Sequence, residues 1–292
     1  MMQDLWVLLE VYWISMFVAA YAGALLAQFG SQLAGRDQSL QVFCLSQGAL
    51  TGVLLGLLMI MFYGGVEALH ASVEGHSVVP GVTALAFAAV LSVLLERVNH
   101  GMAASRNTIF IALFCILISL NSLISRLFPA LEQQFSRVFF GNFTTASIHA
   151  LEVLAGFTFV LGIAYLKRWR TYTRETFEYA FFGFFQENRV HKKRLVFELS
   201  VLAYICVCIQ TIGFVGTLAL LFLPTVLVRF WRVSHIGYHL IAVSLLAMLA
   251  VPLGFILSLM YPGLPTISMM VLMMVGLAFL GFIAQRVRRI AP

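Results

Sequence analysis

Hydrophobic residues along this chain occur in long, nearly unbroken runs separated by short polar stretches. About nine runs reach or approach the roughly 20 residues that a helix needs to cross a hydrocarbon core of about 30 Å. None alternates between apolar and polar positions as barrel strands do, and lipid offers backbone groups no hydrogen-bond partners. The pattern predicts an all-α, polytopic membrane bundle of about nine transmembrane helices. The predicted spans cover approximately residues 5–30, 42–63, 80–96, 108–128, 147–166, 195–212, 216–230, 236–260 and 264–285.

The segment between the sixth and seventh runs, QTIGFVG (Gln210 to Gly216), leaves little room for a loop. Two short helices and a re-entrant element both fit it, and the second alternative lowers the number of crossings to about eight. The first run lacks the basic start and the small-residue cleavage site of a signal peptide, so we interpret it as a retained helix. We expect residues 1–292 to form a single transmembrane domain.

Composition supports a lipid environment. Of the 292 residues, 61% are hydrophobic and only 10% are charged, and the mean hydropathy is +0.97. A water-soluble domain carries about a quarter charged residues to cover its surface. The composition therefore excludes a water-soluble protein, and the net charge of +6 is not by itself a sign of nucleic-acid binding.

The basic residues divide unevenly between the two sides of the predicted bundle. If the N-terminus lies outside, 16 of the 18 Lys and Arg residues fall on the cytoplasmic side, and only Arg126 and Arg137 fall outside. Eight of them belong to one long connection, from Lys167 to Arg194. Cytoplasmic segments of membrane proteins are enriched in Lys and Arg, so the distribution predicts an external N-terminus and a cytoplasmic C-terminus.

The chain carries no recognisable catalytic motif. It contains no Gly-rich phosphate loop, no paired nucleophile and base, and no Cys/His spacing of a structural zinc site. We therefore expect neither an enzyme nor a resident cofactor. If transport through this protein is driven by ATP, the ATP must be hydrolysed by a separate subunit.

The long connection at about 167–194 is a candidate contact for such a subunit. Its middle, ETFEYAFFGFF, has helical character and aromatic bulk, and basic clusters flank it at the level of the lipid headgroups. An interfacial helix held by anionic lipid fits the segment, and so does a coupling helix inserted in a groove of a soluble partner. The second interpretation assigns the contact to Glu175, Phe177, Glu178, Phe181, Phe182 and Gly183.

Four segments, in the appropriate order, resemble the permeases of zinc and manganese ABC importers. QTIGFVGTLALLFLPTVLVRFW (210–231) resembles the family's Gly-containing turn and the apolar helix after it. CLSQGALTGVLLG (44–56) resembles the second helix, FFGNFTTAS (139–147) the outer Phe-Gly-Asp turn, and YPGLPTISMMVL (261–272) the Pro-rich turn before the last helix. The matching positions of the first segment are Gly213, Pro224, Thr225 and Arg229.

The resemblance implies a multi-pass subunit of the bacterial inner membrane, surrounded by the lipid bilayer. Its implied partners are a second permease copy, which gives a homodimer or a pair with a sister permease, a cytoplasmic ABC ATPase dimer that uses ATP, and a periplasmic or surface metal-binding protein. Nucleic acid is not an implied partner. The long basic connection occupies the place of the family's coupling segment.

This chain departs from the family pattern at several positions. Phe43 and Gln47 stand where the family has an Asp and then a His, and the outer Phe-Gly-Asp ends in Asn142. The acidic residue before the Pro-rich turn near Tyr261 is missing, and the coupling segment has one extra residue before Gly183. These departures leave the metal, zinc or manganese, open.

Ionisable and amide side chains within or near the spans are candidates for a substrate pathway, because such groups are costly in a membrane. Imidazole and carboxylate suit zinc, manganese and iron, and the predicted topology puts several of these groups on the outer side. A solvated polar loop is the alternative for the residues after the second span, and contact with a neighbouring helix is the alternative for Gln210. The pathway candidates are Glu10, Gln47, Glu67, His70, Asn142, His149, Glu152 and Gln210, with His70, His149 and Glu152 as metal ligands.

Two other functions stay open. A permease of the same fold for a metal chelate, or a heteromeric partner that has lost its metal contacts, fits the departures. A membrane-embedded enzyme or scaffold fits the outer His and Glu residues but not the ordered family motifs.

Overall fold

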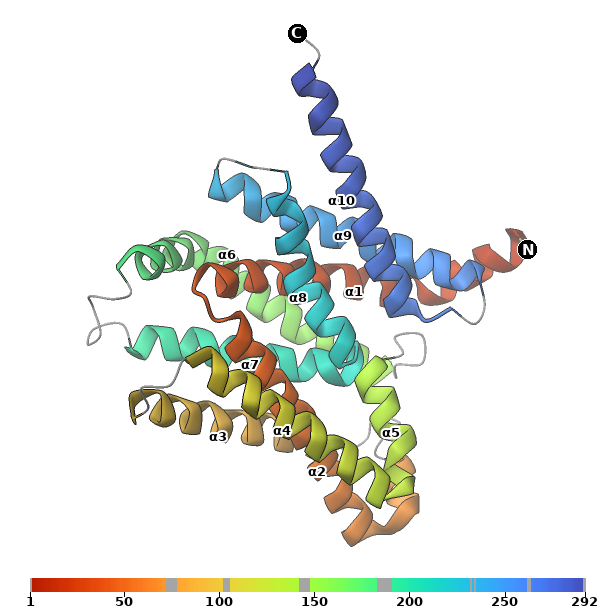
Figure 1. The fold of residues 1–292 in the computed structure, drawn as a ribbon. Coiled ribbons are helices and arrows are strands. Elements are labelled where there is room, and N and C mark those ends of the chain that lie inside the picture. The colour runs from red at the N-terminus through yellow and green to blue at the C-terminus, as the bar shows by residue number, and fades with distance from the viewer. Residues whose placement is uncertain are drawn as a thin grey trace.

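A computed structural model of the chain describes residues 2–71, 78–101, 106–141, 148–182, 191–231, 233, 235–261 and 264–290. Within these residues the chain forms ten α-helices and no strand, as the hydrophobic pattern predicts (Figure 1). The helices are α1 (Met2–Gly35), α2 (Ser39–Ala71), α3 (Val79–Gly101), α4 (Arg106–Leu127), α5 (Pro129–Phe140), α6 (Ile148–Phe182), α7 (His191–Thr211), α8 (Phe214–Arg229), α9 (Ile236–Met260) and α10 (Thr266–Ile290).

Each predicted span overlaps one of these helices. Six helices are long and apolar enough to cross a membrane, and their apolar parts are Glu10–Gly35, Ser39–Gly65, Asn107–Leu127, Ile148–Glu178, Ile236–Met260 and Thr266–Arg286. Three shorter apolar helices, Val79–Leu95, Val196–Thr211 and Phe214–Arg229, coincide with the other three predicted spans. The all-helical membrane fold is confirmed, whereas the number of crossings and the side of each terminus stay predictions.

The segment from Gln210 to Gly216 forms a tight turn between two separate helices. Gly213 has a φ of +93° and caps the start of α8, and Gly141, which follows α5, has a φ of +73°. The two backbones touch, since a Cβ on Gly141 would lie 1.8 Å from the carbonyl oxygen of Ile212. Only glycine combines this backbone conformation with this close approach, so the turn fixes α5 against the start of α8.

Helix α5 is the one described helix that the hydrophobic runs do not predict. It has 12 residues and is too short to span a membrane. Its sequence carries start and stop signals, with Pro129 in the first turn, Glu132 also in the first turn and Arg137 in the last. These signals are local and polar, so the pattern of long apolar runs does not reveal this helix.

The helices pack in two groups that share α7 (Figure 1). Helix α1 packs mainly against α9, α8 and α6, and α2 packs mainly against α3 and α4. α1 and α8 cross closely, because a Cβ on Gly30 would lie 1.6 Å from the carbonyl oxygen of Leu221. Among the apolar windows of the six long helices, that of α2 is 72% buried, whereas those of α4 and α10 are 28% and 22% buried. Helix α2 is thus central, and α4 and α10 expose apolar faces of the kind that lipid covers.

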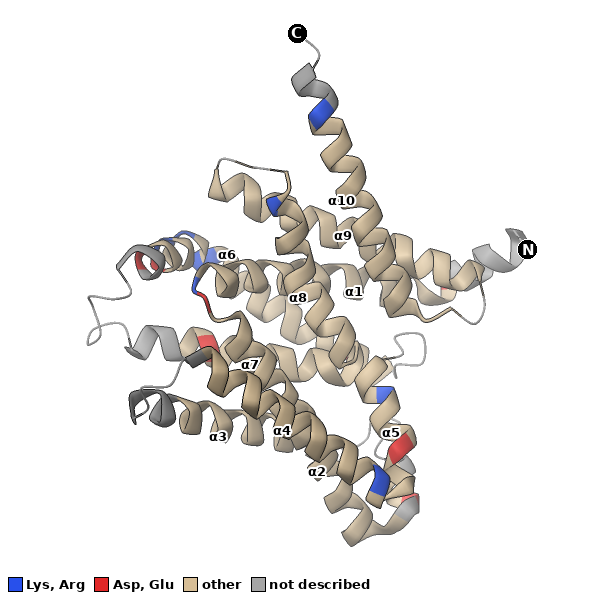
Figure 2. Ribbon diagram, viewed as in Figure 1, with Lys and Arg blue, Asp and Glu red and all other residues tan. Residues whose placement is uncertain are grey.

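The charged side chains gather at the ends of the helices and leave their apolar middles free of charge (Figure 2). The last part of α6 carries Lys167, Arg168, Arg170 and Arg174, and Arg36, which follows the end of α1, lies close beside it. The end of the bundle where α1 and α6 finish and α2 and α7 begin is called the basic end below. It is the natural candidate for the cytoplasmic face.

Candidate transport pathway and coupling segment

Gln47 lies in the central helix and is completely buried. Neither its amide oxygen nor its amide nitrogen has a hydrogen-bond partner among the described residues, although its backbone carbonyl accepts a bond from the Thr51 hydroxyl at 3.0 Å. A buried polar group without a partner costs about 1–3 kcal/mol. A bound ligand, ion or water can satisfy such a group, so Gln47 remains a pathway candidate.

Phe43, one turn before Gln47, closes α2 against α8. Its ring stacks on that of Phe222 with centroids 4.9 Å apart and an angle of 11° between the planes. Ser46 on α2 and Thr225 on α8, each three residues from one of these rings, also have buried hydroxyl groups without partners in the described part of the chain. The contact between α2 and α8 thus combines an aromatic stack with buried polar atoms that have no partner among the described residues.

His149 and Glu152 meet at the start of α6, at the end of the bundle opposite the basic end. The Nδ1 atom of His149 lies 3.3 Å from a carboxylate oxygen of Glu152, and the two side chains are 73% and 68% exposed. The described residues hold no group of three or more His, Cys, Asp or Glu that could bind a metal ion. The structure therefore brings together one predicted ligand pair without completing a coordination sphere.

The remaining pathway candidates are not joined to that pair. Glu10 on α1 and Glu67 on α2 are exposed. The side chain of His70 and the whole of Asn142 lie outside the described residues. Gln210, at the end of α7, is exposed and packs against the start of α3, where a Cβ on Gly81 would lie 2.9 Å from its amide nitrogen. The role of Gln210, in the pathway or in a bond to a neighbouring helix, stays a prediction.

The coupling segment begins as a direct continuation of α6. This helix runs for 35 residues to Phe182, so the predicted contact residues up to that point share one rigid rod with the membrane-spanning part. Phe177 is 55% exposed, and Glu178 forms an exposed ion pair with Arg174 at 2.7 Å. The side chains of Phe181 and Phe182, and Gly183, lie outside the described residues. The sequence predicts a separate helix in the coupling segment. In the structure, the first half of the segment is instead the last part of α6.

A polar network on one face of α1 was not predicted from the sequence. Gln28 and Gln32, one turn apart, both bond to the Tyr165 hydroxyl of α6, each at 3.1 Å. Gln28 also donates to Ser244 and to the carbonyl oxygen of Leu240 on α9, the latter at 3.0 Å. The available signal was the spacing of Gln28, Gln32 and Arg36, which places three polar side chains on one face of an apolar run.

The fold and this distribution of polar groups are those of a polytopic, α-helical membrane protein with a candidate pathway residue in its central helix. The chain belongs to the ABC 3 transport family, which matches residues 5–285. It is therefore a metal-ion ABC transporter permease, as the sequence motifs predict.

The fold is also that of a solved structure, PsaBC from Streptococcus pneumoniae in complex with Fab. The two share a TM-score of 0.76 and 13% sequence identity, over 97% of this chain and 95% of the other. No curated protein matches the sequence. The structural similarity establishes the architecture over nearly the whole length, and the family match establishes the class of transporter.

Proposed function

We propose that this chain is the membrane-spanning subunit of a bacterial ATP-driven importer of divalent metal ions, of the zinc or manganese class. The family match over residues 5–285 carries the proposal. The buried, unpaired amide of Gln47 in the central helix supports a polar ligand inside the bundle. Amide oxygens bind divalent cations less strongly than carboxylates, which suits a site that must release its cargo.

The proposed assembly contains two permease copies in the inner membrane, an ABC ATPase dimer on the basic end and a binding protein on the opposite face. The basic clusters of α6 and the exposed Phe177 support the basic end as the cytoplasmic docking face. His149 and Glu152 lie on the opposite face, where cargo from the binding protein arrives. ATP-driven closure of the ATPase pair then moves the coupling segment and switches access between the two sides.

A permease for a metal chelate is the second candidate, and so is a heteromeric partner subunit. The observation that favours a chelate is Phe43, which stands where the family pattern has an Asp and stacks on Phe222. A stacked pair of aromatic rings near an unpaired amide suits an organic chelator better than a bare cation.

Copurification tests the class of machine. The chain, tagged and extracted from its native membrane in mild detergent, should bring down a nucleotide-binding subunit in stoichiometric amount. The cargo of the periplasmic partner is then identified by elemental analysis and mass spectrometry. A bare zinc or manganese ion supports the first candidate, an organic chelate supports the second, and a preparation without any ATPase refutes the proposed function.

Replacement of His149 and Glu152 together by Ala tests the arrival side. Both side chains are exposed and contact each other, so their removal should leave the bundle folded and bound to its ATPase. We expect metal uptake to fall because a ligand pair at the outer mouth is lost. Uptake equal to that of the wild type would show that the pair is an ordinary surface contact.

A further inference from the structure

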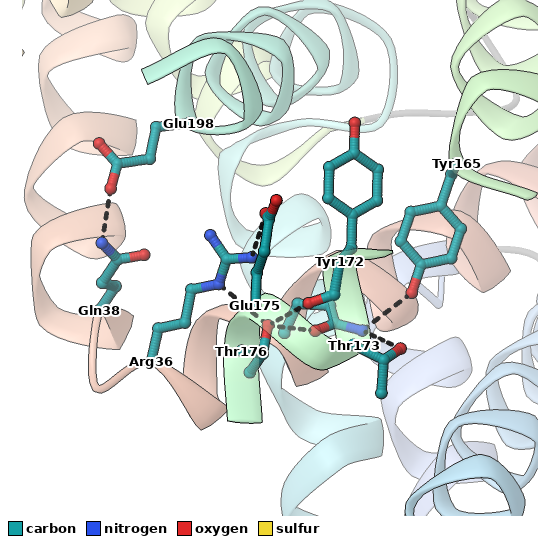
Figure 3. Close-up of polar contacts among 9 residues, drawn as sticks. Arg36, Gln38, Tyr165, Tyr172, Thr173, Glu175, Thr176 and Glu198 are labelled. Carbon is teal, nitrogen blue, oxygen red and sulfur yellow. Dashed lines mark hydrogen bonds and ion pairs between the residues drawn. The ribbon is translucent and has the colours of Figure 1, made fainter. Parts of the chain in front are cut away.

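The short turn between α1 and α2 is held by α6 and α7, the helices that contain the two ends of the coupling segment. On one side, the Arg36 Nε atom donates a hydrogen bond to the Thr176 hydroxyl of α6 at 3.0 Å. An Nη atom of the same guanidinium lies 3.9 Å from a carboxylate oxygen of Glu175, also on α6 (Figure 3). Arg36 thus ties the turn to the end of α6.

On the other side, the same turn is tied to α7. The Gln38 amide donates a hydrogen bond to the carboxylate of Glu198, near the start of α7 (Figure 3). The guanidinium carbon of Arg36 also lies 4.4 Å from the centroid of the Phe197 ring, a distance typical of a cation–π contact. The two residues on either side of Asp37 therefore contact both helices that lead to and from the coupling segment.

These contacts are buried, which distinguishes them from ordinary surface pairs. Arg36 is 4% and Gln38 is 1% exposed, whereas the Arg174 and Glu178 pair on the same α6 helix is largely solvated. Water screens an exposed ion pair and lowers its contribution to stability. Separating a buried charge from its several partners costs much more free energy. The α1–α2 turn should therefore move together with α6 and α7, to which these buried contacts join it.

The turn itself has little freedom to absorb such a movement. Backbone bonds from Arg36 N to Gln32 O at 3.2 Å and from Gln38 N to Leu33 O at 3.0 Å close it directly onto the end of α1. α2 begins at Ser39, and Gln47 lies nine residues beyond Gln38, or about 14 Å along a helix that rises 1.5 Å per residue. A displacement of the turn is thus passed on to the central helix.

We propose that the α1–α2 turn, held through Arg36 and Gln38, carries movement of the coupling segment into α2 and so to the buried Gln47. The polar network on α1 extends the same connection, because Thr176 donates to Gln32 as well as accepting from Arg36. The inference rests on the proposed function, in which the coupling segment is the contact with the ATPase. Arg36 and Gln38 act as positioning residues and touch neither metal nor nucleotide.

The test uses the full permease and ATPase complex in proteoliposomes and measures metal ions transported per ATP hydrolysed. Arg36→Lys combined with Gln38→Leu keeps the positive charge but removes the forked contact with α6 and the bond to α7. We expect this ratio to fall about fivefold or more, the low end of typical coupling factors, while the ATPase still copurifies. An unchanged ratio overturns the inference.

A matched control separates coupling from general stability. Tyr204→Phe removes a different buried contact among α1, α6 and α7, in which the Tyr204 hydroxyl lies 2.9 Å from the Thr158 hydroxyl and 3.3 Å from the Ala22 carbonyl oxygen. It should lower the melting temperature without changing the transport ratio. An equal loss of coupling in this control overturns the specific role of the turn.

A measurement on the wild type covers the case in which the variant does not fold. Hydrogen exchange is recorded with and without a non-hydrolysable ATP analogue bound to the complex. We expect altered exchange in peptides that cover residues 36–47, and exchange unaffected by the nucleotide there overturns the inference. Failure of the wild-type chain to bind any ATPase is a different result, and it refutes the proposed function instead.

Discussion

At the residue scale, Gln28 and Gln47 are both glutamines on apolar helices but differ in their partners. Gln28 is half-buried and donates to Leu240 and Ser244, whereas both amide atoms of Gln47 are unpaired among the described residues. We expect Gln47→Leu to leave the stability of the bundle unchanged or raise it by about 1–3 kcal/mol, because it removes an unpaired buried group. Gln28→Leu should lower the stability by about 1–2 kcal/mol through lost hydrogen bonds.

Thermal unfolding in detergent and metal uptake distinguish these two residues. Gln47→Leu should reduce uptake while the protein stays folded, as expected of a functional group that costs stability. If Gln47→Leu destabilises the protein as much as Gln28→Leu does, the Gln47 amide has a structural partner and its role in the pathway is refuted.

At the scale of elements, helix crossings depend on particular glycines. A Cβ on Gly30 would lie 1.6 Å from the Leu221 carbonyl oxygen, so Gly30→Ala has to push α1 and α8 apart and should destabilise the bundle by about 1–3 kcal/mol. Gly156 in α6 has no atom within 4 Å of the corresponding position. Gly156→Ala should therefore stabilise by about 0.5–1 kcal/mol through helix propensity. Equal effects of the two substitutions on the unfolding temperature would contradict the close crossing.

The sequence predicts elements well where a long apolar run defines them. Each predicted span overlaps a helix, since the length of a span is set by the bilayer and its composition by lipid. Helix α5 is missed because 12 partly polar residues carry only local signals. The continuation of α6 through Phe182 is also missed, because its basic residues look like the end of a span although nothing in them breaks a helix.

Only part of the candidate site can be predicted from the sequence. Gln47 is found from its polarity and its place in a family motif, both local features. The contact between Arg36 and Thr176 joins residues 140 positions apart, and a single sequence does not reveal which distant helices meet. The pairing of Gln38 with Glu198, 160 positions apart, is beyond prediction for the same reason.

At the scale of the whole molecule, the division of basic residues predicts an orientation. Cysteines placed at Glu132 on α5 and at Arg168 on α6, in a background without Cys44, Cys115, Cys206 and Cys208, should react with membrane-impermeant reagents from opposite sides. The residue on α5 should react from outside, because the basic clusters of α6 favour the cytoplasm. Labelling of both positions from the same side would contradict the predicted topology.

The central claim is that this chain conducts metal ions when an ABC ATPase hydrolyses ATP. Its most direct test is uptake of radioactive zinc and manganese into proteoliposomes that contain the chain, its copurified ATPase and its binding protein. We predict uptake that requires ATP, and that stops when the ATPase is inactivated in its own catalytic site. Uptake that proceeds equally without ATP, or no uptake of either metal by a complex that hydrolyses ATP normally, would contradict the account.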